Sequence, residues 1–158
     1  MTAVLVPPLV RTEAELAARL LPPATSRWVR GWRGWVAPLM TMLVGASLRW
    51  PNLGWPKAFV FDETYYAKDA WSMTLHGIEW NWKNKADDAI LAANGNAAAI
   101  AKVMSDSSAY VVHPPVGKWV ISLGEMMFGL TPFGWRFMVC VLGTLSILVT
   151  ARLAQHLT

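Results

Sequence analysis

Two long uncharged stretches dominate the pattern of hydrophobic and polar positions along the chain. The first covers residues 31–50, where an uncharged centre is flanked by Trp and Arg. The second covers residues 133–155 and has no charge between Arg136 and Arg152. A helix that crosses a bilayer needs about 20 mainly apolar residues, and Trp and Arg at its ends suit the interface. The pattern therefore predicts two transmembrane helices, with a buried helix of a soluble core as the alternative for the first.

The loop between these spans, residues 51–132, has helical patterns of its own. Residues 62–76 predict a short helix with an apolar side. Residues 115–130 follow a proline suited to a first helical position, and their apolar residues recur at helical spacing. The polar positions of this second helix fall on its opposite face: Lys118, Ser122 and Glu125. We therefore expect an amphipathic helix that lies along the membrane surface rather than crossing it.

Residues 84–108 differ from the rest of the loop because they are alanine-rich and polar, with a turn signal at Asn94-Gly95. We expect a variable insertion there, with up to two weak helices, and the least ordered part of the loop. The predicted fold class is an all-α membrane protein, in which two transmembrane helices are joined by a long outer loop with interfacial amphipathic helices.

The charge distribution predicts the orientation of the spans. Five arginines and no lysine occur up to residue 33, whereas residues 51–133 hold eight acids and six lysines. Basic residues near a span favour the cytoplasmic side. We therefore expect the tail at residues 1–30 and the end at residues 156–158 in the cytoplasm, and the loop outside. The protein would then be a multi-pass protein of the cell membrane.

Composition agrees with a membrane protein. Hydrophobic residues make up 54% of the chain, charged residues only 15%, and there are ten tryptophans. The formal net charge of +4 comes from residues near the membrane-flanking ends, without a basic stripe and stacking aromatics, so nucleic acid is not an expected partner. The lipid bilayer, by contrast, is an expected partner. The single cysteine, Cys140, cannot close an intrachain disulfide.

Asp62 and Glu63 interrupt an otherwise apolar and aromatic stretch that includes Phe61 and Tyr65. One interpretation is structural: Asp62 is a good N-cap, and Glu63 suits the first turn of a helix. The other is chemical, because a carboxylate beside apolar and aromatic groups is partly desolvated and a better base than in water. The residues alone leave both open.

Three further side chains are candidates on the outer face. His113 precedes two prolines and is either an interfacial or a functional histidine, and Lys118 follows closely. Arg136, at the outer end of the second span, either extends toward the interface or turns inward to hold a phosphate by a bidentate contact. The sequence has no paired Cys or His spacing for a metal site, no phosphate-binding glycine loop and no nucleophilic serine motif, so no cofactor is expected, and a need for a divalent metal is left open.

These motifs, in this order, resemble the start of a protein O-mannosyltransferase. The segments FDETYYAKDAWS, VHPPVGKW and FGWRF are similar to the bacterial branch of that family, which uses polyprenyl-phosphate mannose. The family belongs to the GT-C type of membrane glycosyltransferases. The resemblance covers roughly residues 35–155 and leaves the insertion at 84–108 and the tail unexplained.

The resemblance implies roles for the candidate residues. Asp62 would be the general base that takes the proton of a Ser or Thr hydroxyl in an acceptor protein, and Glu63 would hold the acceptor or orient the base. Arg136 would sit near the donor phosphate, with His113 and Lys118 as further substrate-binding residues. Transfer would invert the anomeric centre.

The family fold has many more spanning helices than this chain. We therefore expect a truncated GT-C-like fold, an N-terminal piece that is inactive alone and that pairs with the missing C-terminal membrane helices. Two alternatives remain: another lipid-phosphate-sugar glycosyltransferase, or a non-catalytic membrane subunit.

Overall fold

A computed structural model of the chain describes residues 31–157, in two compact units. Within the described residues, one unit comprises residues 31–44 and 146–157, and the other is Gly45–Leu145. The predicted cytoplasmic tail at residues 1–30 lies outside the described residues. All the candidate site residues belong to the unit Gly45–Leu145.

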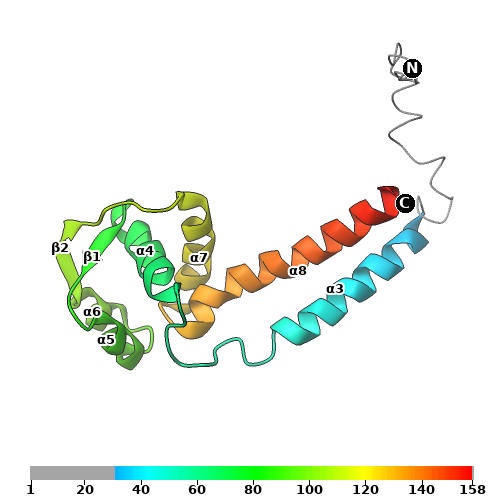
Figure 1. The fold of residues 1–158 in the computed structure, drawn as a ribbon. Coiled ribbons are helices and arrows are strands. Elements are labelled where there is room, and N and C mark those ends of the chain that lie inside the picture. Colours follow the sequence, from blue (N-terminus) through cyan, green and yellow to red (C-terminus); the bar gives the residue numbers. More distant parts are fainter. Residues whose placement is uncertain (1–30, 158) are drawn as a thin grey trace, which may run out of the picture. The chain divides into compact units, whose positions relative to one another are not determined.

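Among the described residues, one helix is long and apolar enough to cross a membrane. This is α8 (Pro132–Leu157), whose apolar window spans Pro132–His156 (Figure 1). Its bounds fall close to the predicted second span. Many of its apolar side chains are exposed within the chain, which suits a helix surrounded by lipid or by other helices: Val139, Leu142, Leu145, Val149 and Leu153.

The first predicted span is shorter than expected as a regular helix. A 3-10 turn, η1 (Trp32–Trp35), leads into α3 (Val36–Arg49), which has 14 residues. At 1.5 Å per residue, α3 is about 21 Å long, less than the roughly 30 Å of a bilayer's hydrocarbon core. A crossing by residues 31–50 therefore stays a prediction.

Helix α4 (Glu63–His76) begins one residue later than predicted and ends at Gly77, whose φ of 75° is the left-handed conformation that glycine adopts at a helix end. Its buried side, with Ala67, Ala70 and Trp71, packs along helix α7 (Pro115–Phe128). The apolar spacing of residues 62–76 thus predicted this helix correctly.

Helix α7 lies at the predicted position, but its polar face is not turned toward water. Lys118, Ser122 and Glu125 are buried, whereas Trp119 and Met127 on the apolar face are 55% and 63% exposed. The prediction that the polar face meets water was wrong, because its charges are enclosed by the protein itself. An apolar outer face still suits a membrane surface, and that placement stays a prediction.

The segment expected as an insertion, residues 84–108, contains the two predicted helices and one strand that the sequence did not predict, and a second unpredicted strand comes just before it. Strand β1 (Trp80–Trp82), helix α5 (Ala86–Ala93), helix α6 (Ala97–Ala101) and strand β2 (Met104–Ser108) follow one another, and the strands pair antiparallel. The fold is therefore mostly helical rather than all-α. The strands were not predicted because β1 (WNW) is short and β2 (MSDSS) lacks an alternation of apolar and polar residues.

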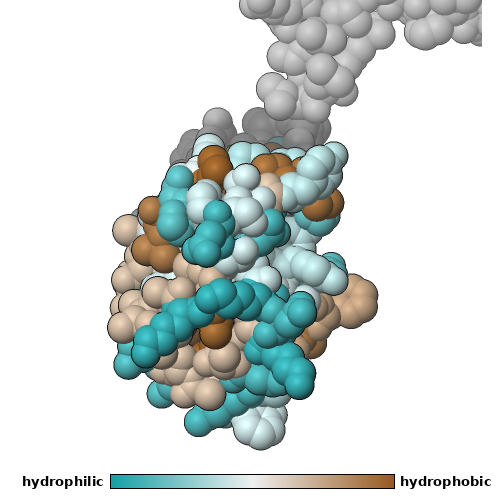
Figure 2. All heavy atoms as spheres, turned by 90° about the vertical axis from the view of Figure 1, so that its left-hand side faces the viewer, coloured by the Kyte–Doolittle hydropathy of each residue, from teal (hydrophilic) through white to brown (hydrophobic). Residues whose placement is uncertain are grey.

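This segment is packed rather than loose. Its side chains Ala86, Ile90, Ile100 and Met104 form one hydrophobic cluster with Ala67 and Trp71 of α4 and with Leu130 and Trp135. The face that carries β2, α5 and α6 mixes hydrophilic and hydrophobic residues, as a surface open to water does (Figure 2). Residues 80–108 thus help to fix α4, on which the candidate site begins.

Helices α7 and α8 approach closely at glycines. A Cβ added at Gly124 would collide with the carbonyl oxygen of Gly134 and would lie 3.4 Å from the backbone nitrogen of Met138. At Gly117, in the same helix, an added Cβ would meet nothing within 4 Å. Gly124 is therefore required by packing, whereas Gly117 is not.

We predict that Gly124→Ala lowers the thermal stability of the purified chain in detergent, because the backbones must separate to admit the methyl group. The expected cost is about 1–3 kcal/mol, as for other overpacked sites. Gly117→Ala is the matched control and should be neutral or slightly stabilising, since alanine is the better helix former. Equal melting temperatures for the two variants would contradict the close contact.

Candidate functional site

The site begins at a tight turn that leads into α4. The Glu63 amide donates to the Val60 carbonyl at 3.1 Å, and Phe61 between them has a φ of 53°. A left-handed backbone at a bulky residue costs roughly 1–2 kcal/mol, so other contacts must hold this turn. The Val60 amide supplies one by donating to Glu63 Oε2 at 3.0 Å. The turn thereby fixes where Asp62 and Glu63 start.

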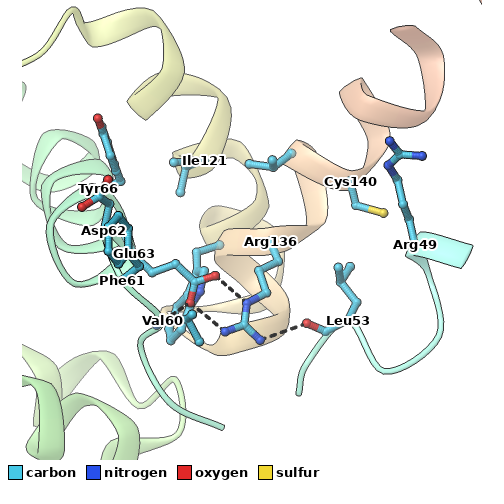
Figure 3. A pocket seen from close by; sticks show the side chains of 13 residues that line it. Arg49, Leu53, Val60, Phe61, Asp62, Glu63, Tyr66, Ile121, Arg136 and Cys140 are labelled. Carbon is cyan, nitrogen blue, oxygen red and sulfur yellow. Dashed lines mark hydrogen bonds and ion pairs between the residues drawn. The ribbon is translucent and has the colours of Figure 1, made fainter. Parts of the chain in front are cut away.

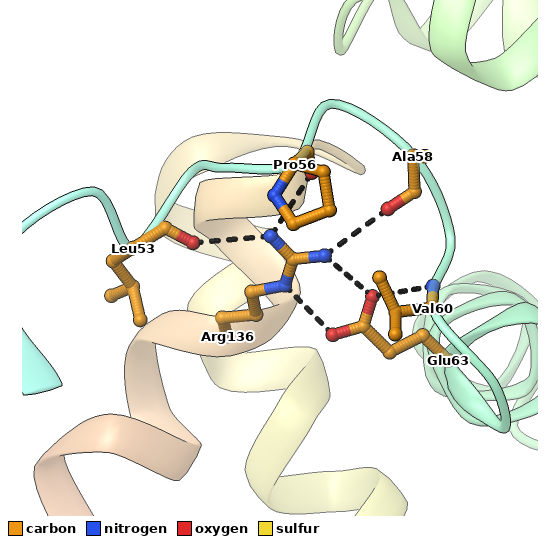
Figure 4. A network of polar contacts seen from close by, with 6 residues as sticks. All are labelled: Leu53, Pro56, Ala58, Val60, Glu63 and Arg136. Carbon is orange, nitrogen blue, oxygen red and sulfur yellow. Dashed lines mark hydrogen bonds and ion pairs between the residues drawn. The ribbon is translucent and has the colours of Figure 1, made fainter.

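Arg136 of α8 is the centre of a polar network around this turn (Figure 4). Its Nε and Nη2 donate to the two carboxylate oxygens of Glu63, each at 2.7 Å. Its remaining N–H groups donate to three carbonyl oxygens of the preceding loop, those of Leu53, Pro56 and Ala58, at 3.1–3.3 Å. An arginine has five N–H donors, so every donor of Arg136 is engaged.

This network keeps the Glu63 carboxylate ionised. Burial by itself would raise the pKa of Glu63, but hydrogen bonds and charge from Arg136, together with the Val60 amide, outweigh it and lower the pKa below its ordinary value. Glu63 is therefore a fixed anion. The resemblance led us to expect Arg136 near a donor phosphate, yet in this arrangement Arg136 has no free donor for one.

Asp62 is arranged differently from its neighbour. It occupies the N-cap position of α4, but its side chain makes no capping hydrogen bond. Asp62 therefore takes the predicted N-cap position, but its side chain does not cap the helix. The carboxylate is exposed and has no hydrogen-bond or ion-pair partner within residues 31–157. Of the two adjacent acids, Asp62 is the one left available for chemistry.

Asp62 lines a cavity of about 520 Å³, which we call the apolar pocket (Figure 3). Its walls are mainly apolar side chains from the turn, from α7 and from α8: Leu53, Val60, Phe61, Ile121, Val139 and Cys140. Figure 3 shows Asp62 on one side of the pocket and Arg49 on the other, beside Cys140.

Arg49 was not predicted as a site residue, because an arginine at the end of a span is usually interfacial. In contrast to Arg136, its guanidinium makes one long hydrogen bond, from Nη1 to the Gly45 carbonyl at 3.5 Å. Its other N–H groups have no partner in the described chain. Arg49 therefore gives the apolar pocket an exposed positive charge with unpaired N–H donors.

Asp62 also lines a second hollow of about 590 Å³, which we call the aromatic groove. Side chains from α4, from β1 and from the segment after β2 form it, among them Tyr65, Tyr66, Trp80, Asn81, Trp82, Tyr110, Val112 and His113. The ring of His113 lies 5.0 Å from that of Tyr66, centre to centre. The structure thus brings together Asp62 and His113, which are far apart in sequence.

Lys118 lines neither cavity. Its side chain is fully buried, and its ammonium group contacts Asp69 Oδ2 at 2.9 Å and the carboxylate of Glu79. Burial would lower the pKa of Lys118, but the two carboxylates more than offset this and raise it. Lys118 is therefore a buried cation that joins α7, α4 and the start of β1, and we do not propose it as a substrate ligand.

Comparison with known proteins shows similarity to enzymes named polyprenol-phosphate-mannose–protein mannosyltransferase. The chain is 31% identical to the Mycobacterium tuberculosis protein and 32% identical to that of Mycolicibacterium smegmatis, each over 80% of this chain and 20% of the relative. It is 36% identical to the Corynebacterium glutamicum protein, over 63% of this chain and 16% of the relative. The chain therefore spans about a fifth of the length of these relatives. No protein-family model and no solved structure matches it.

We predict that Glu63→Gln lowers stability in a pH-dependent way. Because the folded pKa of Glu63 is depressed, its contribution is fully present above the pKa of an unfolded glutamate, about 4.3, and is lost as the pH falls through the lower folded value. The melting temperatures of wild type and variant should differ most near neutrality and converge in acid. Asp88→Asn, at an exposed acid of α5, serves as the control and should show no such difference. A gap between wild type and Glu63→Gln that does not depend on pH would contradict the ion pair.

Proposed function

We propose that this chain forms the part of a membrane glycosyltransferase in which Asp62 acts as general base, transferring mannose from polyprenyl-phosphate mannose to Ser or Thr hydroxyls of proteins. The observation that supports this most directly is the contrast between two adjacent acids. Glu63 is fully engaged by Arg136, whereas Asp62 is unpaired and lines two cavities. The names of the similar proteins support the donor and the acceptor.

The proposed reaction is a single displacement. Asp62 accepts the proton of the acceptor hydroxyl while that oxygen attacks the anomeric carbon of the mannose. The bond from this carbon to the phosphate oxygen breaks, and the lipid phosphate leaves with the bonding electron pair. Because the leaving group is already a stable anion, the step needs a base and a nearby cation more than a general acid. Attack from the face opposite the phosphate inverts the anomeric centre.

The apolar pocket is the proposed place of the donor. Its apolar walls suit the first isoprenoid units of a lipid, and such burial contributes about 25 cal/mol per Å² of apolar surface. Arg49 supplies the positive charge that attracts the phosphate, and its exposed side chain can turn toward the head group. We assign Arg136 to positioning instead: it holds the loop and Glu63, and thereby keeps Asp62 in place.

The proposal places the site at the outer membrane surface. The exposed apolar faces of α7 and α8 are consistent with contact to lipid, and α8 is long enough to cross the bilayer. A lipid donor whose chain stays in the membrane can reach a site only at a membrane surface. The multi-pass topology with a cytoplasmic N-terminus belongs to this proposal.

We predict that Asp62→Asn abolishes most transfer without loss of folding. The test uses a chimera in which residues 31–157 replace the matching segment of the Mycolicibacterium smegmatis relative, with polyprenyl-phosphate mannose and a threonine peptide as substrates. Loss of a general base typically lowers the rate by about 10²–10⁴-fold. Asparagine preserves the shape and the N-cap preference of this position, so the melting temperature should not change.

The matched control is Asp88→Asn, the same chemical change at an exposed acid that lines neither cavity. It should transfer mannose at the wild-type rate. Undiminished turnover by Asp62→Asn would remove Asp62 as the base. Transfer to a lipid or glycan acceptor, but not to the peptide, would favour a different lipid-phosphate glycosyltransferase.

A further prediction concerns the donor. Arg49→Gln in the same chimera should raise the KM for polyprenyl-phosphate mannose with little change in kcat. A hydrogen bond to a charged group contributes about 1.5–3 kcal/mol, which corresponds to roughly ten- to a hundredfold in affinity. Arg33→Gln changes an arginine that does not line the pocket and should leave the KM unchanged. Equal KM values for both variants would show that Arg49 does not bind the donor.

A further inference from the structure

The segment between β2 and α7 has backbone groups without partners. The antiparallel pairing continues one residue past β2, where the Ala109 amide donates to the Glu79 carbonyl at 2.9 Å. Beyond it, no backbone N–H or C=O of Tyr110, Val111 or Val112 forms a hydrogen bond with any described residue. Figure 1 shows this segment as an open connection that runs from the end of β2 to the start of α7.

These three residues are also exposed. Tyr110 is 88%, Val111 56% and Val112 67% accessible, although all three are large and partly or wholly apolar. An exposed apolar segment with unpaired N–H and C=O groups is a template on which another extended chain can pair. Recognition of an extended peptide by strand addition uses this kind of surface.

The location of the segment connects it with the proposed base. Tyr110 and Val112 line the aromatic groove, which Asp62 also lines. At the end of the segment, the ring of His113 lies against that of Tyr66 on α4. An extended peptide that pairs with Tyr110–Val112 therefore lies in the same groove as the Asp62 carboxylate.

We propose that Tyr110–Val112 binds the acceptor polypeptide as an added β-strand in the aromatic groove, which brings a Ser or Thr hydroxyl to Asp62. This inference rests on the proposed function, since it assigns the acceptor to one of the two cavities at Asp62. Main-chain hydrogen bonds do not depend on the side chains of the peptide, so this mode of binding suits an enzyme whose acceptors share little but a hydroxyl. Tyr65, Tyr110 and Asn81 are then the side chains that contact residues flanking the acceptor.

The unpaired backbone favours a peptide over a sugar as the occupant. Aromatic rings such as Trp80 and Tyr110 can pack against either ligand. A sugar, however, needs side-chain hydrogen bonds to its hydroxyls and would leave the N–H and C=O groups of Tyr110–Val112 without partners. An extended peptide offers these groups complementary donors and acceptors at the spacing of a strand.

The test measures binding of a fluorescent alanine-rich peptide with one central threonine to the 158-residue chain in lipid nanodiscs, without donor. A series of peptides has one N-methyl group each, moved from amide to amide. In a strand, successive N–H groups point to opposite edges, so methylation of alternate amides should weaken binding by about two- to tenfold. The amides between them should tolerate the methyl group.

A pair of protein variants tests the other side of the same contact. Val111→Pro and Val112→Pro each remove one N–H group that has no partner in the described chain, so neither should change the melting temperature. Because neighbouring residues of a strand present their N–H groups to opposite edges, only one of the two variants should weaken binding of the peptide. Each variant is thus the control of the other.

Other results would overturn the proposal. These are the absence of peptide binding, equal effects of N-methylation at every amide, equal effects of the two proline variants, or displacement of the peptide by free mannose, which would make the groove a sugar site. The proposed function can be tested independently of this inference. If the chimera transfers mannose but the alternating pattern is absent, only this acceptor site is wrong; if the pattern is present without transfer, the groove binds peptides but the transferase function is wrong.

Discussion

The structure depends on the complete hydrogen bonding of one guanidinium group. The side chain of Arg136 is only 13% exposed, and a partly buried cation is stable only when its charge and its donors are satisfied. A single carboxylate can accept two of the five N–H groups. The other three require carbonyl oxygens, and the loop before α4 supplies them from Leu53, Pro56 and Ala58. The path of this loop is therefore set by the needs of an arginine that lies more than 70 residues later in the chain.

This constraint separates the roles of two adjacent acids. Successive residues at a helix start point about 100° apart, so Asp62 and Glu63 cannot face the same group. Glu63 faces Arg136 and becomes part of the support. Asp62 is held at a defined place but has no partner, so its carboxylate remains free to accept a proton. A rigid support next to an uncommitted base is the arrangement that general base catalysis requires.

The sequence predicted the elements better than their environments. Apolar spacing located α4 and α7, and a long uncharged stretch located α8, to within a few residues, because both patterns arise from the helix itself. The buried side of α7 was missed, since an amphipathic pattern indicates water on the polar side. Lys118 is instead enclosed by Asp69 and Glu79, and distant partners of this kind leave no local signal. The same reason explains Arg136: its charge and position suggested a phosphate, but three of its partners are backbone carbonyls, which any residue can provide.

The position of Asp62 between two unlike cavities suits the geometry of an inverting transfer. In a single displacement, the attacking oxygen and the leaving phosphate lie on opposite sides of the anomeric carbon, so donor and acceptor must approach from different directions. The apolar pocket matches a lipid phosphate in its walls and in the charge of Arg49, and the aromatic groove matches a polypeptide in its unpaired backbone at Tyr110–Val112. A base that lines both cavities can receive the acceptor proton without contact with the leaving group. Under the proposed function, the division of the surface around Asp62 into these two environments gives a physical basis for inversion, since each substrate would be directed to its own side before the reaction begins.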